Sequence, residues 1–262
     1  MIRALMTAAS GMKTQQMQVD TIANNIANVN TAGFKKSELA FRDMLYQTLR
    51  EPGAPTGASS MSPTGLQIGS GAEVASSLKI FRQGEVEPTG GQYDLAIAGQ
   101  GFFRVQLGSG EFRYTRDGSF RPDGNGALVT ADGFKLDPPV SIPSDAIETI
   151  IGQDGTVSVL KAEGGVPEIV SNVSLFRFPN PSGLKAQGGN MFTETASSGP
   201  VQQANPGVSG TGTILQRAVE RSNVQVVDEL VGLILAQRNY EVNSRAIRVS
   251  DDMLQQVNNL IR

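Results

Sequence analysis

The stretch IRALMTAASGMKTQQMQVDTIANNIANVNTAGFK, residues 2–35, decides the fold. Its apolar and small neutral residues recur at steps of three and four, which is the spacing of a coiled-coil seam on one face of a helix. The seam positions are Ile2, Leu5, Ala9, Met12, Gln16, Val19, Ala23 and Ile26. We expect the helix to end in the amide-rich run before Gly33, because short amide side chains compete for backbone hydrogen bonds and glycine accepts positive φ.

A second, longer helix is expected at the other end of the chain, from Asn223 to Arg262. Ser222 and Gln225 have capping-box spacing at its start. Apolar side chains recur along it every seven residues: Val226, Leu233, Tyr240, Ile247, Leu254 and Ile261. A second row lies beside the first, so the apolar face is wide enough to contact more than one neighbour. This row consists of Leu235, Val242 and Val249.

Residues that break helices are kept out of both ends. All 13 prolines lie between Pro52 and Pro206, and only Gly11 and Gly232 of the 30 glycines fall inside the expected helices. The stretch from Tyr46 to Gly71 is rich in Pro, Gly, Ser and Thr, which predicts an extended connector, with a disordered linker as the alternative. Leu66 and Ile68 could anchor the far end of this connector to an ordered part of the protein.

Alternating apolar residues follow the connector and predict strands. The alternation covers Tyr93, Leu95 and Ile97, then Phe103, Val105 and Leu107, then Val157 and Val159. Asp-Gly pairs at 117, 123, 132 and 154 provide turns between strands. No sustained helical period occurs between residues 75 and 210, so we expect one β domain there.

The predicted fold class is α+β. Long N- and C-terminal helices pair as a coiled coil, and a mainly antiparallel β domain with extended connectors is inserted between them. The expected domains are a discontinuous terminal core of residues 1–40 with 213–262, a connector of residues 41–75, and an outer β domain of residues 76–212. The helix pair serves either as an intramolecular hairpin that joins the ends of one domain, or as the interface of a polymer.

Composition excludes several classes of chemistry. The chain has no cysteine and no histidine, which rules out disulfides, thiolate nucleophiles, Cys/His metal sites and the Ser-His-Asp triad. A net charge of −3 with no basic cluster gives no indication of nucleic-acid binding. The sequence shows neither a secretory signal pattern nor an apolar run long enough for membrane insertion.

The remaining motifs are weak, so we expect no catalytic, cofactor-binding or metal-binding residues. Gly99-Gln100-Gly101 lacks the third glycine of a dinucleotide fingerprint, and a turn between strands is the better interpretation. Asp117, Asp123 and Asn125 do not have calcium-loop spacing. Hydrolysis by paired carboxylates is not excluded by composition, which leaves a periplasmic wall hydrolase as an alternative.

The motifs at the two ends resemble those of one known family. Residues 23–35, ANNIANVNTAGFK, resemble the N-terminal signature of the bacterial flagellar axial family of rod and hook proteins. The signature positions are Asn24, Asn25, Asn28, Asn30, Thr31, Gly33, Phe34 and Lys35. The C-terminal stretch with SNV at 222–224, ELV at 229–231 and AQRNYE at 236–241 is similar to the closing helix of the same family.

Within that family the connector resembles that of distal-rod members. The matching residues are Tyr46, Gln47, Thr48, Pro52, Gly53 and Leu66. In such members this segment is associated with a straight, stiff rod. A proximal rod or hook subunit of the same family is the alternative.

The resemblance implies a structural subunit without cofactors, located in the flagellum basal body. Copies would form a helical tube that crosses the periplasm and transmits motor torque to the hook, after type III export without a cleaved signal peptide. Further partners would be proximal rod and hook subunits and the bushing rings of the outer membrane and peptidoglycan. The expected subunit-packing residues are Leu5, Met12, Val19, Ile26, Val226, Leu233, Tyr240, Ile247, Leu254 and Ile261.

Overall fold

A computed structural model describes residues 2–53, 63–161 and 166–260 of the chain. The chain forms two compact units. The helical unit contains Met1–Ile26, Ser37–Leu78 and Gln225–Arg262, and the β unit contains Ala27–Lys36 and Lys79–Val224. The chain therefore passes from one unit to the other four times, after residues 26, 36, 78 and 224.

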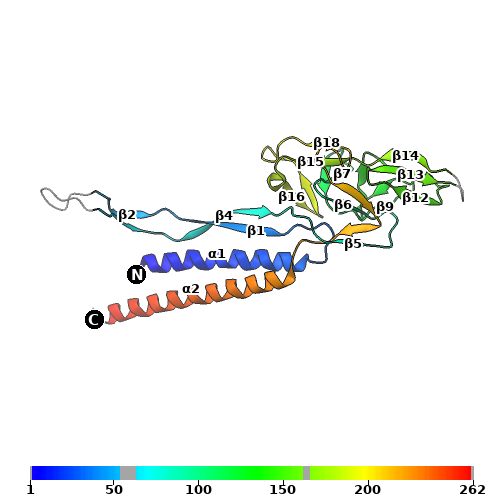
Figure 1. Cartoon of the computed structure of the whole chain (residues 1–262). Coiled ribbons are helices and arrows are strands. Elements are labelled where there is room, and N and C mark those ends of the chain that lie inside the picture. Colours follow the sequence, from blue (N-terminus) through cyan, green and yellow to red (C-terminus); the bar gives the residue numbers. More distant parts are fainter. Residues whose placement is uncertain (1, 54–62, 162–165, 261–262) are drawn as a thin grey trace. The chain divides into compact units, whose positions relative to one another are not determined.

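Two helices lie side by side and antiparallel in the helical unit (Figure 1). Helix α1 spans Ile2–Ala27, and helix α2 spans Val226–Leu260. The end of α1 at Ala27, inside the amide-rich run, confirms the predicted end of the first helix. None of the described helices is long and apolar enough to cross a membrane.

The predicted start of the second helix is wrong. The Oγ of Ser222 accepts a hydrogen bond from the Val224 N–H at 3.3 Å, and α2 begins only at Val226. The Glu229 N–H donates to the Gln225 carbonyl oxygen at 3.1 Å, so Gln225 stands at the helix entry and not three residues into it. The capping box fails because residues 222–224 are buried in extended backbone of the β unit.

The face that α1 buries is not the predicted seam. Its buried residues are Ala8, Thr14, Ile22 and Asn25, and none of the eight predicted seam positions is among them. On α2 the buried side chains are Glu229, Ala236 and Ser250. Two of the buried residues of α1 meet α2: Asn25 bonds to Glu229, and Ile22 lies against Gly232. The predicted coiled-coil pairing of the apolar stripes is not confirmed within the chain.

Both helix glycines lie where the helices approach each other. A Cβ on Gly11 would stand 2.8 Å from the Asn243 amide nitrogen, and one on Gly232 would stand 3.4 Å from the Cδ1 of Ile22. Close approach of two helix backbones requires small residues at the contact. The positions of these glycines therefore follow from the packing of α1 on α2.

The predicted connector is an ordered β-ribbon in the part that the structure describes. Strand β1 (Ser37–Asp43) pairs with β4 (Ala72–Lys79), and β2 (Gln47–Arg50) pairs antiparallel with β3 (Leu66–Ile68). The Ala72 N–H donates to the Ser10 Oγ at 3.3 Å, which ties this ribbon to α1 (Figure 1). These residues form paired strands, and a separate connector of residues 41–75 stays a prediction. Residues 54–62 of the connector lie outside the described part.

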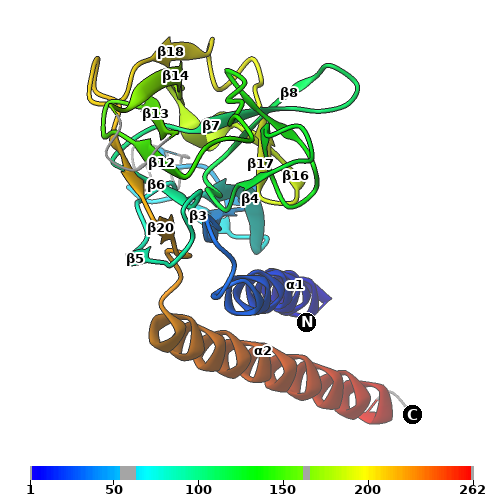
Figure 2. The same ribbon diagram turned by 90° about the vertical axis from the view of Figure 1, so that its right-hand side faces the viewer.

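The β unit consists of short antiparallel strands (Figure 2), which confirms the mainly antiparallel β domain. Its largest sheet has seven strands in the order β16-β17-β8-β7-β11-β10-β9, and a second sheet has the order β12-β13-β14. The remaining strands form the pairs β15–β18, β19–β6 and β20–β5.

The strand bounds are β5 Val86–Pro88, β6 Leu95–Ala98, β7 Phe103–Gln106, β8 Phe112–Thr115, β9 Arg121–Pro122, β10 Leu128–Val129, β11 Lys135–Asp137, β12 Glu148–Ile151, β13 Thr156–Leu160, β14 Glu168–Asn172, β15 Leu175–Arg177, β16 Lys185–Gly188, β17 Met191–Thr193, β18 Gln202–Ala204, β19 Thr213–Gln216 and β20 Ala218–Glu220. A 3₁₀ turn, Pro181–Gly183, is the helical element of this unit among the residues described.

Two hydrophobic cores support these strands. One is mainly aliphatic and includes Leu95 and Phe103, and the other is aromatic and includes Phe102, Tyr114 and Phe178. The neighbouring residues Phe102 and Phe103 belong to different cores, because successive side chains of extended backbone point to opposite faces. The segment before β7 therefore anchors both cores.

The glycines of the helix pair give a direct test of its packing. Gly232→Ala is expected to raise the free energy of unfolding of the helical unit by up to about 1 kcal/mol, because alanine has the higher helix propensity and its Cβ meets only an ordinary contact. Gly11→Ala should raise the free energy of unfolding by less, because the new Cβ would displace the Asn243 side-chain amide. Urea unfolding followed by far-UV circular dichroism measures both. Equal gains for the two variants would contradict the described contact.

Candidate assembly site

Asn25 of the signature segment joins three elements of the helical unit. Its side-chain amide donates to the Ser37 carbonyl oxygen at 2.9 Å and to the Glu229 carboxylate at 3.2 Å. Its Oδ1 accepts the Ser37 N–H at 2.9 Å. Asn25 is buried, so all these bonds are made away from water. One amide thereby fixes the end of α1 against the start of β1 and the first turn of α2.

The next signature residues form a tight turn in the β unit. The Thr31 N–H donates to the Asn28 carbonyl oxygen at 3.2 Å, and the Thr31 hydroxyl lies 3.2 Å from the Asn28 Oδ1. Asn24 in α1 and Asn30 within this turn are both exposed. The turn redirects the chain from the helix toward the strands.

Gly33 occupies a position that no other residue fits. Its φ is 68°, in the left-handed region, and a Cβ there would stand 2.6 Å from the Asp117 backbone nitrogen and 2.7 Å from the Arg116 carbonyl carbon. Its N–H donates to the Glu220 carbonyl oxygen at 2.7 Å. The glycine of the signature is therefore required by both conformation and space.

Phe34 and Lys35 complete the signature and are buried in the β unit. The Lys79 ammonium lies 4.5 Å from the centroid of the Phe34 ring, a cation–π contact. Burial lowers the pKa of the Lys79 side chain. Lys35 extends its ammonium in the same unit toward a buried carboxylate.

That carboxylate belongs to Glu220 and is the centre of a buried charge cluster. The Lys35 Nζ donates to the Glu220 Oε1 at 2.5 Å and to the Arg82 carbonyl oxygen at 2.9 Å. The Arg116 Nε lies 2.8 Å from the Glu220 Oε2 as an ion pair that lacks hydrogen-bond geometry. The Arg116 guanidinium also donates to the carbonyl oxygens of Gly99 and Gly101, at 2.9 and 2.7 Å.

The electrostatics of this cluster are those of a structural site. Burial lowers the pKa of the Lys35 ammonium, the Glu220 carboxylate opposes that shift, and the Arg116 charge adds to it. The Lys35 ammonium donates to Glu220 and to the Arg82 carbonyl oxygen. The Arg116 guanidinium donates to the carbonyl oxygens of Gly99 and Gly101, while its Nε forms only the ion pair with Glu220. Sequence reasoning identified Lys35 but missed Glu220 and Arg116 as its partners, because no spacing in the sequence links residues 35, 116 and 220.

The predicted subunit-packing residues lie at the edges of the helix contact or outside it. Partly buried are Leu5, Met12, Val19 and Ile26 on α1, and Leu233, Ile247 and Leu254 on α2. Val226 and Tyr240 are exposed, and Ile261 lies outside the described residues. The helix pair therefore does not bring these residues together into one buried seam.

A group of exposed apolar residues at the start of α2, of which only Leu235 belongs to the rows predicted from the sequence, is named here the α2 patch: Val227, Leu230, Val231, Ile234 and Leu235. Their side chains are between 45% and 73% exposed. The segment VVDELVGLIL, residues 226–235, is apolar on nearly every side, and one partner helix covers only one side. That composition is the signal by which the sequence could have revealed the patch.

The predicted connector residues also project apolar side chains into solvent. Tyr46 and Leu66 are 56% and 50% exposed, and Leu45 is 91% exposed. Gln47 and Thr48 lie in β2, where the Gln67 side chain donates to the Thr48 hydroxyl at 3.3 Å. Pro52 and Gly53 follow at the exposed end of the strand.

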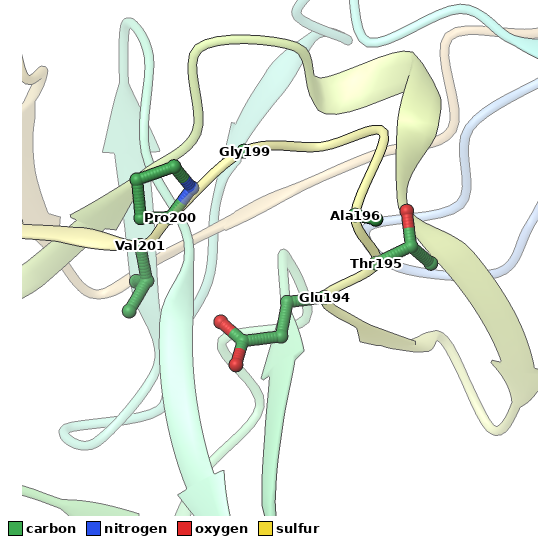
Figure 3. Close-up of a pocket in the computed structure, with 6 residues that line it drawn as sticks. All are labelled: Glu194, Thr195, Ala196, Gly199, Pro200 and Val201. Atoms are coloured by element: carbon green, nitrogen blue, oxygen red, sulfur yellow. The ribbon is translucent and has the colours of Figure 1, made fainter.

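A hollow on the β unit is lined by one loop (Figure 3). Its lining residues are Glu194, Thr195, Ala196, Gly199, Pro200 and Val201. The Thr195 N–H donates to the Ser198 Oγ at 3.0 Å, which stabilises the loop. Glu194 is the only acid among these lining residues, whereas hydrolysis by carboxylates requires a pair. This hollow gives no support to the wall-hydrolase alternative.

The buried charge cluster predicts a large loss of stability when its carboxylate is removed. Glu220→Gln leaves two buried cations without a countercharge, and we expect it to lower the free energy of unfolding of the β unit by about 3–5 kcal/mol. Glu87→Gln breaks a half-exposed ion pair with Arg221 and should cost less than about 1 kcal/mol. Urea unfolding measures the free energy of unfolding of both variants. Similar losses for the two would refute the role of the cluster.

Gly33→Ala tests the space argument separately from the conformational one. Gly110 also has positive φ, 85°, but a Cβ there would meet nothing within 4 Å. Gly110→Ala should therefore cost only the left-handed backbone, about 1–2 kcal/mol. Gly33→Ala adds a clash with backbone atoms and should cost clearly more. Thermal unfolding of the two variants measures the difference, and equal costs would show that space at Gly33 is not limiting.

Three family models match the chain. "Flagella basal body rod protein" matches residues 5–35, "Flagellar hook protein FlgE/F/G D1 domain" matches residues 96–159, and "Flagellar basal body rod FlgEFG protein C-terminal" matches residues 215–260. The first covers α1 from residue 5 onward and the last covers all of α2, and the second covers strands β6 to β13 except the first residue of β6 and the last residue of β13. A crystal structure of a Helicobacter pylori flagellar hook protein, FlgE2, aligns over 71% of this chain and 43% of its own, with 14% identity and a TM-score of 0.25.

Curated relatives match from end to end. The flagellar basal-body rod protein FlgG of Borreliella burgdorferi is 46% identical over 264 residues, covering all of both chains. FlgG of Buchnera aphidicola is 44% identical over 260 residues, 99% of this chain and all of its own, and FlgG of Bacillus subtilis is 41% identical with both chains covered completely. These relatives are named as rod proteins, and none of the names is that of an enzyme. The chain belongs to the FlgG family of flagellar basal-body rod proteins.

Proposed function

We propose that this protein is a structural, non-enzymatic subunit of the flagellar distal rod. Many copies assemble into a helical tube that crosses the periplasm and transmits motor torque to the hook. The observation that carries the proposal is the set of large apolar side chains that α1 and α2 leave exposed or only partly buried, which we assign to contacts with other copies.

Several contacts of the helix pair are made by small or polar residues. Asn25 contacts Glu229, Gly11 faces Asn243, and Ile22, the one large apolar residue that α1 buries, lies against Gly232. Burial of apolar area is the main source of helix association in water, at about 25 cal/mol per Å². The contacts through small and polar residues therefore hold the two helices close but contribute little hydrophobic free energy.

The apolar side chains lie next to that contact. Leu5, Met12, Val19 and Ile26 follow Ala4, Gly11, Gln18 and Asn25 by one residue each, which places them about 100° around the helix axis. These α1 residues are partly buried, whereas the α2 patch is exposed. Large exposed apolar patches on a protein mark interaction surfaces. We propose that the α1 stripe of one copy packs as a coiled coil against the α2 patch of another.

Such a contact joins two different surfaces of the same chain. A heterologous contact whose rotation does not close on itself builds a helical filament instead of a ring. The terminal helices would form the inner wall of the tube, and the β strands would lie outside. The same geometry provides end surfaces for proximal rod subunits on one side and hook subunits on the other.

The ribbon of β1 to β4 favours the distal rod over the proximal rod and the hook. An isolated two-stranded ribbon is marginally stable in water, and this one exposes Leu45, Tyr46, Leu49 and Leu66. Packing of these side chains on adjacent copies would stabilise the ribbon and stiffen the tube. We further propose contacts with the bushing rings of the outer membrane and peptidoglycan, and type III export without a cleaved signal peptide, on the ground of family membership.

Charge placed in the α2 patch should block assembly without unfolding the chain. Val231 and Ile234 are 53% and 56% exposed, so the double variant Val231→Glu, Ile234→Glu is expected to keep its fold, with surface changes costing about 0.5 kcal/mol or less each. It should form no filaments in sedimentation and electron microscopy and should not restore motility to cells lacking their own distal rod subunit.

The matched control places the same charges on exposed polar positions of the same helix. Gln237→Glu, Gln255→Glu adds two carboxylates and removes no apolar side chain. This variant should assemble normally. Normal filaments from the Val231→Glu, Ile234→Glu chain would overturn the proposed interface.

A further inference from the structure

Three segments of the β unit end where the chain leaves for the helical unit. The first, residues 33–36, ends at the passage after residue 36. The second, residues 79–84, starts at the passage after residue 78, and the third, residues 218–224, ends at the passage after residue 224. All three lie within the β unit, and every pair of them is joined directly.

The first and second segments are joined by backbone and lysine contacts. The Ile80 N–H donates to the Lys36 carbonyl oxygen at 3.0 Å. The Lys35 ammonium donates to the Arg82 carbonyl oxygen at 2.9 Å, and the Lys79 ammonium donates to the Lys35 carbonyl oxygen at 3.0 Å. These reciprocal lysine bonds connect the two segments in both directions.

The third segment is joined to both others through Glu220 and Asn223. The backbone oxygen of Glu220 accepts a hydrogen bond from the Gly33 N–H at 2.7 Å. Its carboxylate accepts one from the Lys35 ammonium and another from the Gly84 N–H, the latter at 2.8 Å. The Asn223 Oδ1 accepts the Lys36 N–H at 2.8 Å. The Asn223 amide donates to the carbonyl oxygens of Ile80 and Arg82, at 2.8 and 3.0 Å.

These contacts close a triangle, because each segment is bonded to each of the others. Glu220 and Asn223 are 1% and 7% exposed, and Lys35 is 1% exposed. A buried polar group that loses its partner keeps its full desolvation penalty, so one segment cannot shift without breaking costly bonds to the other two. Arg116 extends the triangle to the Gly99–Gly101 turn between β6 and β7.

We propose that Lys35, Glu220, Asn223 and Arg116 form a joint that makes the three exit segments open and move only as one body. A pull or twist that reaches any one segment is then shared by all three. Within the proposed rod function, this joint passes torque through three connections at once instead of through one tether. The joint itself does not depend on assembly.

Hydrogen exchange followed by mass spectrometry tests the joint in the full, unassembled chain. Asn223→Ala removes bonds to the other two segments. We expect backbone amides in all three segments, residues 33–36, 79–84 and 218–224, to exchange faster together, by roughly tenfold. Amides of β7, in the core of the same unit, should keep their rate and so exclude global unfolding.

Two further variants complete the test. Glu87→Gln removes the half-exposed carboxylate that pairs with Arg221. It should leave the rate of amide hydrogen exchange unchanged in all three segments. If Asn223→Ala unfolds the β unit, Lys35→Met serves instead, because it removes the bonds that the Lys35 ammonium of the first segment makes to the other two. It should again speed amide hydrogen exchange in all three segments. Acceleration confined to the substituted segment would overturn the joint and leave the rod proposal standing. Conversely, filaments from Val231→Glu, Ile234→Glu would overturn the rod interface without affecting this result.

Discussion

The contact between α1 and α2 is the constraint on which the helical unit depends. Glycine, alanine and amide side chains allow the helices to approach closely, and the Asn25–Glu229 hydrogen bond fixes the pair at one end. Ile22 of α1 lies buried against Gly232, but many large apolar side chains of α2 remain exposed. In the proposed rod, neighbouring copies cover these side chains.

The signature segment follows helix α1 along the chain, and its part in the β unit is held there by buried polar contacts. Buried ion pairs contribute little net stability compared with apolar residues of the same size, but they tolerate few alternative arrangements. Lys35 and Glu220 therefore specify how the chain enters and leaves the β unit more than they stabilise it. This role accounts for a lysine in the interior of the β unit.

The sequence predicted the elements better than their contacts. Helical spacing located both helices, and alternation with Asp-Gly turns located the β domain, because these patterns arise from local geometry. The buried face of α1 was missed, since Ala8, Thr14 and Asn25 bury little apolar surface and leave no hydrophobic signal. The capping box at Ser222 failed because tertiary burial held residues 222–224 extended. The partners of Lys35 depend on contacts between residues more than 80 positions apart, which no single sequence reveals.

The ribbon shows a similar limit of sequence-based prediction, because its composition resembles that of a linker while its strands pair across residues distant in sequence.

The β unit carries one more consequence of its construction. Since Phe102 and Phe103 are adjacent in the chain but belong to separate cores, disturbing the backbone between them loosens both at once. The two cores cannot melt independently, so this unit should denature in a single cooperative transition despite its many small sheets.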